Sequence, residues 1–400
     1  MPIPVSATVT IERILPGGLG LAHAEGLTLF VALAAPGDVV RVRLDRIRGK
    51  VAFASIEEVI EPSSVRVEPP CPYFGVCGGC DFQQLNYQAQ LDTKTEMIRD
   101  CLRRIAQIES PPEIAIHPAP QAWQYRMRAN WQLDPVTRRL GYFESGSHRV
   151  CDVEVCAVLA PRLQGILERV RSEFHAGSVP VLPKDIRAVV GDDDISVAPP
   201  LAGFQTNDVS LSIAGETYSF NADSFFQVSP GLLGALIDEA TGTANGADTR
   251  GAVAIDLYCG AGLFTLPLAR RFARVVGVEV NERASGFALR NLEGAQLHNA
   301  EVVTANVGQW LKDNSNSLAP ADFLLLDPPR VGAENIVIKG ILDLQPRHIS
   351  YVSCDPATLA RDLKKLIAAG YALNSITAFD MFPQTHHVET VVHLARNQVA

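Results

Sequence analysis

The sequence lacks the features that would place this protein in or across a membrane. None of its apolar stretches reaches the ~18 residues needed to cross a bilayer. Its N-terminal stretch, MPIPVSATVTIER, has no basic start followed by an apolar run, so we expect no signal peptide. An internal repeat and a low-complexity tract are also missing, which argues against a repeat protein or a disordered chain. We therefore expect a globular protein of the cytoplasm with no membrane contact.

Positive charge is in short supply, but it is locally concentrated. Lys and Arg number 35 against 44 Asp and Glu, so the formal net charge is −9 and the pI is about 5.5. Over the whole chain this argues against a nucleic-acid partner, although such partners respond to local patches. Basic side chains cluster in RVRLDRIRGK at residues 41–50, and Arg126 and Arg128 lie in WQYRMRANW. Each patch, taken alone, fits a solvated strand face better than a binding surface.

The chain length and the apolar pattern predict several domains. Its 400 residues suffice for two or three domains of usual size, each with a core that needs no disulfide. Residues 1–62 contain short β-rich runs separated by glycine turns, which suits a small barrel of the OB type; a β domain without a ligand fits as well. Residues 63–222 begin with a Pro- and Cys-rich stretch, an amphipathic helix at 87–107 follows, and short strands then surround a helix near 161–174.

Residues 223–400 predict a C-terminal α/β domain. The strand patterns GAVAIDLY, RVVGVEV, ADFLLLD and HISYVSC alternate with helical segments, which is typical of a parallel, doubly wound, Rossmann-like sheet. The last two strand patterns, ITAFDMF and HVETVVHLAR, predict an antiparallel pair at the sheet edge.

A glycine turn in IDLYCGAGLFTLPLA predicts a cofactor site. Asp256 lies near the strand end, and Gly260 and Gly262 make a turn that lets a ligand approach the backbone. The pattern G-x-G-x-x-G is missing, which weakens a dinucleotide interpretation. Glu279, at the end of the next strand, can accept hydrogen bonds from ribose hydroxyls. These features favour S-adenosylmethionine (SAM); a tight turn beside a surface Glu is the alternative.

The fourth-strand motif LLLDPPR places Asp327 at the carboxyl end of a strand, where α/β sheets bind ligands. Amino-methyltransferases often carry a similar motif that ends in an aromatic residue, which stacks on the target base. Here Arg330 takes that place. The acceptor is therefore not expected to be an exocyclic amine.

The stretch YVSCDPATLARDL predicts a strand, a turn and a helix, with Cys354 where the strand stops. Carbon 5 of a pyrimidine becomes nucleophilic when a thiolate adds to carbon 6, which is covalent catalysis. Such chemistry needs a thiolate of low pKa, which a following helix N-terminus favours, and a base. Glu389 in HHVETVVHL offers the carboxylate. The alternative, an inert core cysteine, is weakened by the Asp-Pro that follows Cys354.

Three of the eight cysteines crowd into CPYFGVCGGC, and two more follow in RVCDVEVCAVLAP. In a reducing compartment, clustered cysteines indicate a metal or catalysis rather than disulfides. Four thiolates suit zinc or an iron–sulfur cluster, but zinc sites more often use two C-x2-C pairs. Free thiols in a loop are the alternative without a metal.

These motifs together resemble the bacterial RNA 5-methyluridine methyltransferase family over nearly the whole chain. The resemblance implies that Cys354 is the nucleophile and Glu389 the base, and that SAM is the methyl donor. FFQVSP, DLYCGAG, VEVN, TANV and DPPR are similar to the family's cofactor motifs, which implies SAM contacts at Gln227, Tyr258, Gly260, Glu279, Asn306 and Asp327. Several members have Asn where this chain has Leu263, so that contact is not expected here.

The same resemblance implies a [4Fe–4S] cluster held by Cys71, Cys77, Cys80 and Cys156, with Cys151 as a spare. It also implies that residues 1–62 form an OB-like TRAM domain, that 63–222 form a small α+β iron–sulfur domain, and that 223–400 form the SAM-dependent methyltransferase domain. The helical region at about 83–113 is expected to pack on the catalytic domain. In the central domain, Trp123, Tyr125, Arg126, Arg128 and Trp131 are candidates to stack on and grip RNA bases. Core packing of the two Trp residues fits the pattern at least as well.

The expected partner is RNA, with ribosomal RNA, most simply 23S rRNA, favoured by the TRAM-like domain and the cysteine cluster. Transfer RNA is the alternative substrate. Two further hypotheses are methylation of a different base and an RNA-binding protein that retains a methyltransferase fold without activity. The Cys354–Glu389 pair and the intact cofactor motif argue against both. The protein is expected to be a monomer.

Overall fold

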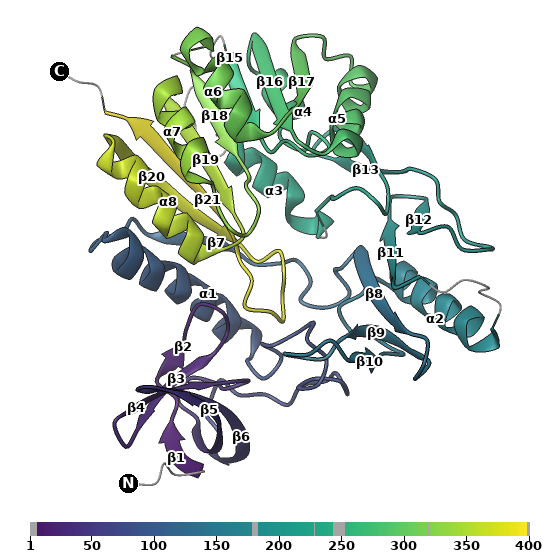
Figure 1. The fold of residues 1–400 in the computed structure, drawn as a ribbon, viewed down its shortest axis with the longest axis vertical. Coiled ribbons are helices and arrows are strands. Elements are labelled where there is room, and N and C mark those ends of the chain that lie inside the picture. The colour runs from purple at the N-terminus through teal and green to yellow at the C-terminus, as the bar shows by residue number, and fades with distance from the viewer. Residues whose placement is uncertain (1–5, 178–182, 228, 243–252, 319, 398–400) are drawn as a thin grey trace.

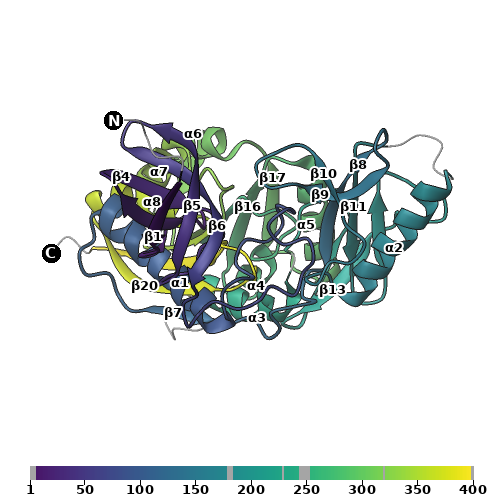
Figure 2. The same cartoon turned by 90° about the horizontal axis from the view of Figure 1, so that it is seen from below.

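The computed structural model describes residues 6–177, 183–227, 229–242, 253–318 and 320–397. Three bodies follow one another along the chain: an N-terminal sheet, a central sheet with one long helix, and a large C-terminal sheet with helices on both faces (Figure 1). Seen from below, the N-terminal and central bodies lie at opposite ends of the molecule (Figure 2). No helix within the described ranges has the length and apolarity needed to span a bilayer.

The N-terminal body is a six-stranded sheet with the order β1-β5-β6-β4-β3-β2. The β-rich runs predict five strands, and the additional one is the two-residue β2, which pairs with β3. Alternate residues of β5 are buried and exposed at its start, which turns its arginines outward. The first five residues of the expected barrel lie outside the described ranges. The strands are β1 Ser6–Thr10, β2 Arg13–Ile14, β3 Gly20–Ala24, β4 Leu27–Val31, β5 Val39–Arg48 and β6 Val51–Glu61.

The central body contains a five-stranded antiparallel sheet with the order β10-β9-β8-β11-β12 and a helix. A separate hairpin that follows it in sequence packs into an apolar core of the C-terminal body. Helix α2, Pro161–Ala176, covers the sheet with a stripe of buried apolar residues, which is the amphipathic pattern predicted near 161–174. The strands are β8 Arg128–Asp134, β9 Arg139–Phe143, β10 Val150–Asp152, β11 Asp185–Val190 and β12 Ile195–Ala198, and the hairpin pairs β13 Val209–Ile213 with β14 Glu216–Phe220.

The C-terminal body is built on an eight-stranded sheet with the order β17-β16-β15-β18-β19-β21-β20-β7. Strands β15 to β19 are parallel, as the alternating pattern predicts, and β21 is antiparallel to both its neighbours. The strands are β7 Ile114–His117, β15 Val253–Leu257, β16 Arg274–Glu279, β17 Ala300–Thr304, β18 Phe323–Leu326, β19 His348–Ser353, β20 Tyr371–Phe379 and β21 Glu389–Arg396.

Helices cover both faces of this sheet, which gives it two apolar cores. One face packs against α3 Pro230–Ala240, α4 Thr265–Ala269 and α5 Glu282–Gly294. The other face packs against α6 Val307–Leu318, α7 Asn335–Leu344 and α8 Pro356–Ala368.

A segment that precedes the central body returns to the C-terminal sheet. Helix α1, Tyr87–Cys101, continues as one π-helical turn, η1 Leu102–Ala106, and the following β7, Ile114–His117, pairs in parallel with β20. Both α1 and η1 contact α8, and Cys101 is buried there as core. The predicted antiparallel pair β20–β21 is present, but its placement at the sheet edge is wrong. β7 forms the edge instead. The prediction missed this because the sequence gives no sign that a strand so far upstream joins this sheet.

Candidate active site

The residues with reactive or charged side chains collect at one edge of the eight-stranded sheet. Asp256 lies near the end of β15, Glu279 ends β16, Asp327 follows β18 and Cys354 follows β19. Because β21 runs antiparallel to β19, its first residue, Glu389, lies at the same edge. Parallel α/β sheets bind their ligands at this carboxyl edge. The fold therefore brings together residues from five separate sequence motifs.

Cys354 and Glu389 lie side by side on neighbouring strands. Ser353 pairs with Thr390 in the ladder between β19 and β21, and Cys354 and Glu389 are the next positions along it. Cys354 is half-buried, whereas Glu389 is only 2% exposed. Within the described part of the chain, Glu389 Oε1 has no hydrogen-bond partner. Burying an unpartnered carboxyl oxygen is costly, which marks this pair as a place where a ligand supplies the missing contact.

The expectation that Cys354 is a low-pKa thiolate is wrong for the protein without ligands. Burial raises the pKa of Cys354 to about 12, and the Glu389 and Asp327 carboxylates add to this effect by disfavouring a second negative charge. Arg330 opposes it. Cys354 is therefore a neutral thiol at pH 7.

The N-terminus of α8 does not stabilise a Cys354 thiolate through its free N–H groups, because the Asp355 side chain already accepts hydrogen bonds from two of them. Asp355 is the N-cap of α8, and its Oδ1 accepts hydrogen bonds from the N–H groups of Ala357 at 2.9 Å and Thr358 at 2.8 Å. Pro356 supplies the first helical residue and has no N–H to offer. The Asp355-Pro356 pair predicted the start of α8 correctly. It did not predict that Asp355 itself would take the N–H groups expected to stabilise the thiolate.

Burial shifts three carboxyl groups at the sheet edge toward their protonated forms. Burial raises the pKa of Asp327 and of Asp256 to about 7, and for Asp256 the nearby Asp327 and Glu279 carboxylates add to the rise. Burial also raises the pKa of Glu389 well above its usual range, with Asp327 as the next cause. A positively charged ligand at this edge would favour the ionised forms, so the edge is suited to a cation.

The turn after β15 exposes backbone to a ligand. Gly260 and Gly262 have φ of 55° and 88°, and a Cβ on Gly262 would lie 3.0 Å from Leu266 Cδ1. The N–H of Gly260 donates to Glu279 Oε2 at 3.0 Å, and the N–H of Asn281 donates to Glu279 Oε1 at 2.8 Å. Each carboxylate oxygen has a second lone pair, so Glu279 is held in place and can still accept from a ligand hydroxyl.

The remaining expected cofactor residues differ in their exposure. Tyr258 is half-buried with a left-handed φ of 64°, and Gln227 is half-buried in the loop before α3. Asn306 is exposed, and its Oδ1 accepts a hydrogen bond from the N–H of Gln309 at 3.1 Å, which caps α6. Leu263 is 8% exposed and packs into the core, so its side chain adds no polar contact.

Arg330 is a site residue whose role the sequence did not reveal. It is exposed in the loop after β18, and its positive charge lowers the pKa of both Cys354 and Glu389. Burial lowers the pKa of His387 to about 3, and the charge of Arg330 adds to this effect. The His387 imidazole is therefore neutral. The motif LLLDPPR shows that a cation, Arg330, follows Asp327. Only the strand order shows that this cation lies near Cys354 and Glu389.

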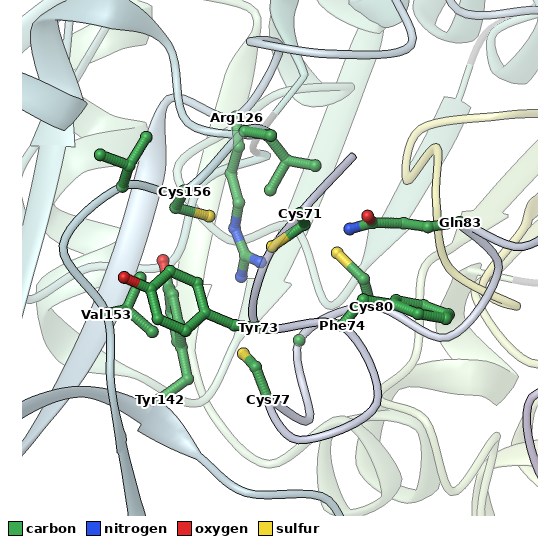
Figure 3. Close-up of a pocket in the computed structure, with 14 residues that line it drawn as sticks. Cys71, Tyr73, Phe74, Cys77, Cys80, Gln83, Arg126, Tyr142, Val153 and Cys156 are labelled. Atoms are coloured by element: carbon green, nitrogen blue, oxygen red, sulfur yellow. The ribbon is translucent and has the colours of Figure 1, made fainter. Parts of the chain in front are cut away.

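Four cysteines line one pocket between the cysteine-rich segment and the central body. Cys71, Cys77 and Cys80 come from the segment, and Cys156 comes from the turn before α2. Their sulfur atoms turn toward a shared space, into which the guanidinium of Arg126 extends (Figure 3). The structure thus assembles the four residues that the sequence singled out.

The cysteines are close enough to affect one another, but they do not form a ready-made metal site. Burial raises the pKa of Cys77 to about 11 and that of Cys80 to about 12, and the other cysteines contribute to both. Among the described residues, no group of three or more His, Cys, Asp or Glu is arranged to hold a metal ion. Cys151 is buried in the core of the central body and does not line the pocket.

The basic stretch on β5 is only partly available to a ligand. Arg41 pairs with Glu58, Arg43 pairs with Asp45, and the Arg46 guanidinium lies 4.5 Å from the centre of the Phe53 ring. Arg48 and Lys50 are exposed at the end of the strand.

Two of the aromatic residues in WQYRMRANW cannot stack on bases. Trp131 is 0% exposed and Tyr125 is 8% exposed, because the alternating pattern of β8 turns Trp131 into the central core and Tyr125 packs against the loop after β20. Trp123 is half-buried. The expectation of base stacking by Tyr125 is therefore wrong, and for Trp131 the structure shows the alternative of core packing.

Comparison with known proteins identifies the relatives of this chain. A family model described as tRNA (Uracil-5-)-methyltransferase matches residues 204–397. The 23S rRNA (uracil(1939)-C(5))-methyltransferase RlmD of Vibrio parahaemolyticus is 32% identical, over 96% of this chain and 94% of that protein. RlmD of Pseudomonas putida is 31% identical, over 98% of this chain and 94% of that protein. This chain belongs to the RNA uracil-C5 methyltransferase family. It is a SAM-dependent enzyme of this class, as the motifs predict.

A solved structure shares the fold of this family member over nearly its whole length. The structure of the Pyrococcus abyssi tRNA (uracil-54, C5)-methyltransferase in complex with S-adenosyl-L-homocysteine has a TM-score of 0.75 and 23% sequence identity. The match covers 97% of this chain and 99% of that chain. The arrangement of several sheets with a C-terminal methyltransferase domain is therefore a shared fold.

Proposed function

We propose that this uracil-C5 methyltransferase acts on a uridine of 23S rRNA, with Cys354 as the nucleophile and Glu389 as the base. The observation that carries the assignment of roles is their position: the thiol and the unpartnered carboxyl oxygen lie side by side at the ligand-binding edge of the sheet. The relatives named RlmD support ribosomal RNA as the substrate. Transfer RNA is the second candidate, because the matching family model is named for it.

In the proposed reaction, Cys354 releases its proton to water and its Sγ bonds to carbon 6 of the flipped uracil, which turns the ring into an enolate. Carbon 5 becomes nucleophilic and takes the methyl group that SAM supplies when it is bound. Glu389, as a carboxylate, then removes the proton from carbon 5, the C5–C6 double bond re-forms and the bond from carbon 6 to Sγ breaks. The target base has to leave its stack to reach Cys354. Arg330 favours the thiolate, since its charge lowers the pKa of Cys354.

We infer that SAM binds along the edge from Gln227 to Asp327. The open turn at Gly260, the held carboxylate of Glu279 and the half-buried Tyr258 are suited to a nucleoside. The carboxyl groups of Asp327 and Glu389, whose pKa values are raised, are suited to a cation such as a sulfonium. Asn306 is proposed as a contact near the adenine through its amide nitrogen.

We also propose that Cys71, Cys77, Cys80 and Cys156 hold a [4Fe–4S] cluster. Four thiols around one pocket are the donor set that such a cluster uses. The guanidinium of Arg126 supports this, because a cation among cysteines suits a group with negatively charged ligands. Binding would require the sulfur atoms to draw together, since the described residues contain no preformed metal group.

The finer domain assignments are part of this proposal. We propose that residues 1–62 are a TRAM domain that uses Arg48 and Lys50 for phosphate contacts, because both side chains are exposed. Residues 63–222 are proposed as the iron–sulfur domain, apart from the region at about 83–113, whose contacts with α8 support its assignment to the catalytic domain at 223–400. The enzyme is proposed to act as a cytoplasmic monomer, which gel filtration of the purified protein would check.

Nucleoside mass spectrometry tests the substrate. Ribosomal and transfer RNA are separated from strains with the wild-type gene, without the gene, and with Cys354→Ala. Loss of 5-methyluridine from 23S rRNA in both mutants supports the proposal. Loss from transfer RNA alone would assign the other substrate, and unchanged 5-methyluridine in every fraction would contradict both.

A further inference from the structure

The loop that leads into Glu389 is held by a distant part of the chain. Residues 380–388 join β20 to β21, and Glu389 is the first residue after them. The loop extends from the sheet toward α1 and the cysteine-rich segment (Figure 1). Its hydrogen bonds to residues outside the loop run to residues 81–125, which include the segment just after Cys80 and helix α1.

Gln384 is the centre of this attachment. It is 3% exposed and has a left-handed φ of 68°, a conformation that a residue with a side chain adopts only when its surroundings hold it. Its carbonyl oxygen accepts from the N–H groups of Asp81 at 3.1 Å and Phe82 at 3.0 Å. Its side-chain nitrogen donates to the carbonyl of Ala122 at 3.3 Å. All of these partners lie far from the loop in sequence.

Gln90 completes the attachment with both ends of its amide. Its Oε1 accepts a hydrogen bond from the backbone N–H of Gln384 at 2.9 Å, and its Nε2 donates to Gln384 Oε1 at 3.0 Å. The same Nε2 donates to the carbonyl of Leu85 at 3.0 Å, which fixes the amide orientation. Gln90 is 1% exposed, so these hydrogen bonds are protected from water. An apolar side chain at this position would leave the N–H of Gln384 unpaired in a buried setting, which is costly.

Both flanks of Gln384 are anchored to the same region. On one side, Lys94 pairs with Asp380 and donates to the carbonyl of Phe382 at 3.0 Å. On the other side, Asp81 accepts from the backbone N–H of His386 at 2.8 Å and contacts its ring. Glu389 follows His386 by three residues, so a shift of this loop moves the start of β21.

Cys354 receives none of these hydrogen bonds, although α1 also packs against α8. Cys354 follows β19 and precedes α8, whose N-terminus Asp355 caps. The side-chain hydrogen bonds of Gln90 go to Leu85 and Gln384 instead. The side-chain hydrogen bonds of Gln90 therefore reach the loop before Glu389 and not the residues that flank Cys354.

We propose that Gln90 is a positioning residue for the base: through Gln384 it holds the loop that places Glu389 beside the nucleophile. This inference rests on the proposed roles of Cys354 and Glu389. A loosened loop impairs removal of the carbon-5 proton more than attack by Cys354. The methylated RNA–enzyme adduct then lives longer, which a merely structural residue would not cause.

Single-turnover kinetics with Gln90→Met tests this, because Met keeps the length and buried volume but lacks both hydrogen-bonding ends. RNA and SAM carrying a labelled methyl group are mixed with excess enzyme, and the adduct is followed on denaturing gels. We expect adduct decay to slow by about 10- to 100-fold, the loss typical of a displaced catalytic group, with adduct formation nearly unchanged. The matched control is Gln88→Met, an exposed glutamine on the same helix, which should behave as wild type.

Tyr125→Phe provides a second, milder variant. It removes the hydrogen bond of 3.0 Å from the Tyr125 hydroxyl to the Pro383 carbonyl and leaves the aromatic packing in place. A smaller lengthening of the adduct lifetime is expected. This variant decides the matter if Gln90→Met does not fold.

Two results would overturn the inference. Formation and decay that slow equally would mean that Gln90 only stabilises the fold, and an unchanged decay in both variants would mean that the loop does not position Glu389. Glu389→Gln is measured beside the two loop variants. It separates a failure of the positioning role of Gln90 from a failure of the proposed role of Glu389. If Glu389→Gln accumulates adduct and the loop variants do not, only the positioning is wrong. If Glu389→Gln releases product at the wild-type rate, the role of the base falls, and the positioning with it.

Discussion

Glu389 lies beside Cys354 across β19 and β21, and its carboxylate is the largest contributor after burial to the raised pKa of that thiol. Without ligands, the pair is therefore electrostatically opposed to nucleophile formation. Arg330 is the neighbouring cation that works in the other direction. For Cys354 to act as the proposed nucleophile, bound substrate and cofactor have to lower its pKa further. The reactive thiolate would then form only in the enzyme that holds both.

Substitution of either member of the pair should give different products. Cys354→Ala is expected to abolish both methylation and the covalent RNA adduct, since the other described thiol at this edge, Cys259, is buried in the turn after β15 near Asp256 and Glu279. Glu389→Gln should still form the adduct but release it slowly, because the amide cannot take the carbon-5 proton. Denaturing gels with labelled RNA and SAM would measure both. Full turnover by either variant would contradict the assigned roles.

The raised pKa of Cys354 should appear in its alkylation by iodoacetamide. The thiolate is the reactive form, so with a pKa near 12 the rate at Cys354 should keep rising well above pH 9 in the ligand-free enzyme. Arg330→Met removes a charge that lowers this pKa, so alkylation at a fixed pH should become slower. Lys364→Met, which removes an exposed cation of α8, is the control. Peptide mass spectrometry resolves Cys354 from the other cysteines, and a rate that levels off below pH 8 would refute the prediction.

The cap of α8 should contribute measurably to stability. Asp355→Ala removes the acceptor for the N–H groups of Ala357 and Thr358 and is expected to cost about 1 kcal/mol. Asp355→Asn keeps an acceptor oxygen and should cost much less. Urea denaturation of the three proteins provides the comparison, and equal stability of the Ala and Asn variants would show that the cap is not the cause.

The buried ion pair between α1 and the loop after β20 should be costly to break from one side. Lys94 and Asp380 are both 0% exposed, and Tyr87 also donates to Asp380 at 2.9 Å. Lys94→Met would leave a buried carboxylate without its charge partner and should lower the free energy of unfolding by about 3–5 kcal/mol. The double variant Lys94→Met, Asp380→Leu should recover much of that loss. No recovery in urea denaturation would mean that the pair acts through packing rather than charge.

The cysteine pocket gives a clear test for the proposed cluster. After anaerobic reconstitution, the wild-type protein should contain about four irons and four acid-labile sulfides and absorb in the visible range. Cys156→Ser should lose most of this content, because Cys156 lines the pocket. Cys151→Ser, which alters a buried cysteine outside the pocket, should retain it. Loss in both variants or in neither would contradict the assigned set of ligands.

Much of the C-terminal fold could be predicted from local patterns. The parallel strands and the glycine turn follow from apolar runs and from residue types that permit few conformations. The placement of β7 beyond β20 could not be predicted, because a four-residue strand has no pattern of its own and joins a sheet whose other strands are over a hundred residues away. The same holds for Gln90 and Gln384, since neither glutamine differs from a surface residue until the fold buries both.

By itself, the sequence determined the kinds of chemistry that this protein can perform. The thiol before Asp355, the carboxylate of Glu389, the glycine turn and the cysteine spacing are covalent facts, and each specifies a reactive group and its local backbone. The tertiary structure decided which groups meet and in what state of charge. Strand order sets Glu389 next to Cys354, burial raises the pKa of that thiol to about 12, and Asp355 takes the helix N-terminus that the sequence assigned to the thiolate. Proximity and desolvation depend on the whole fold, so no local pattern can specify them.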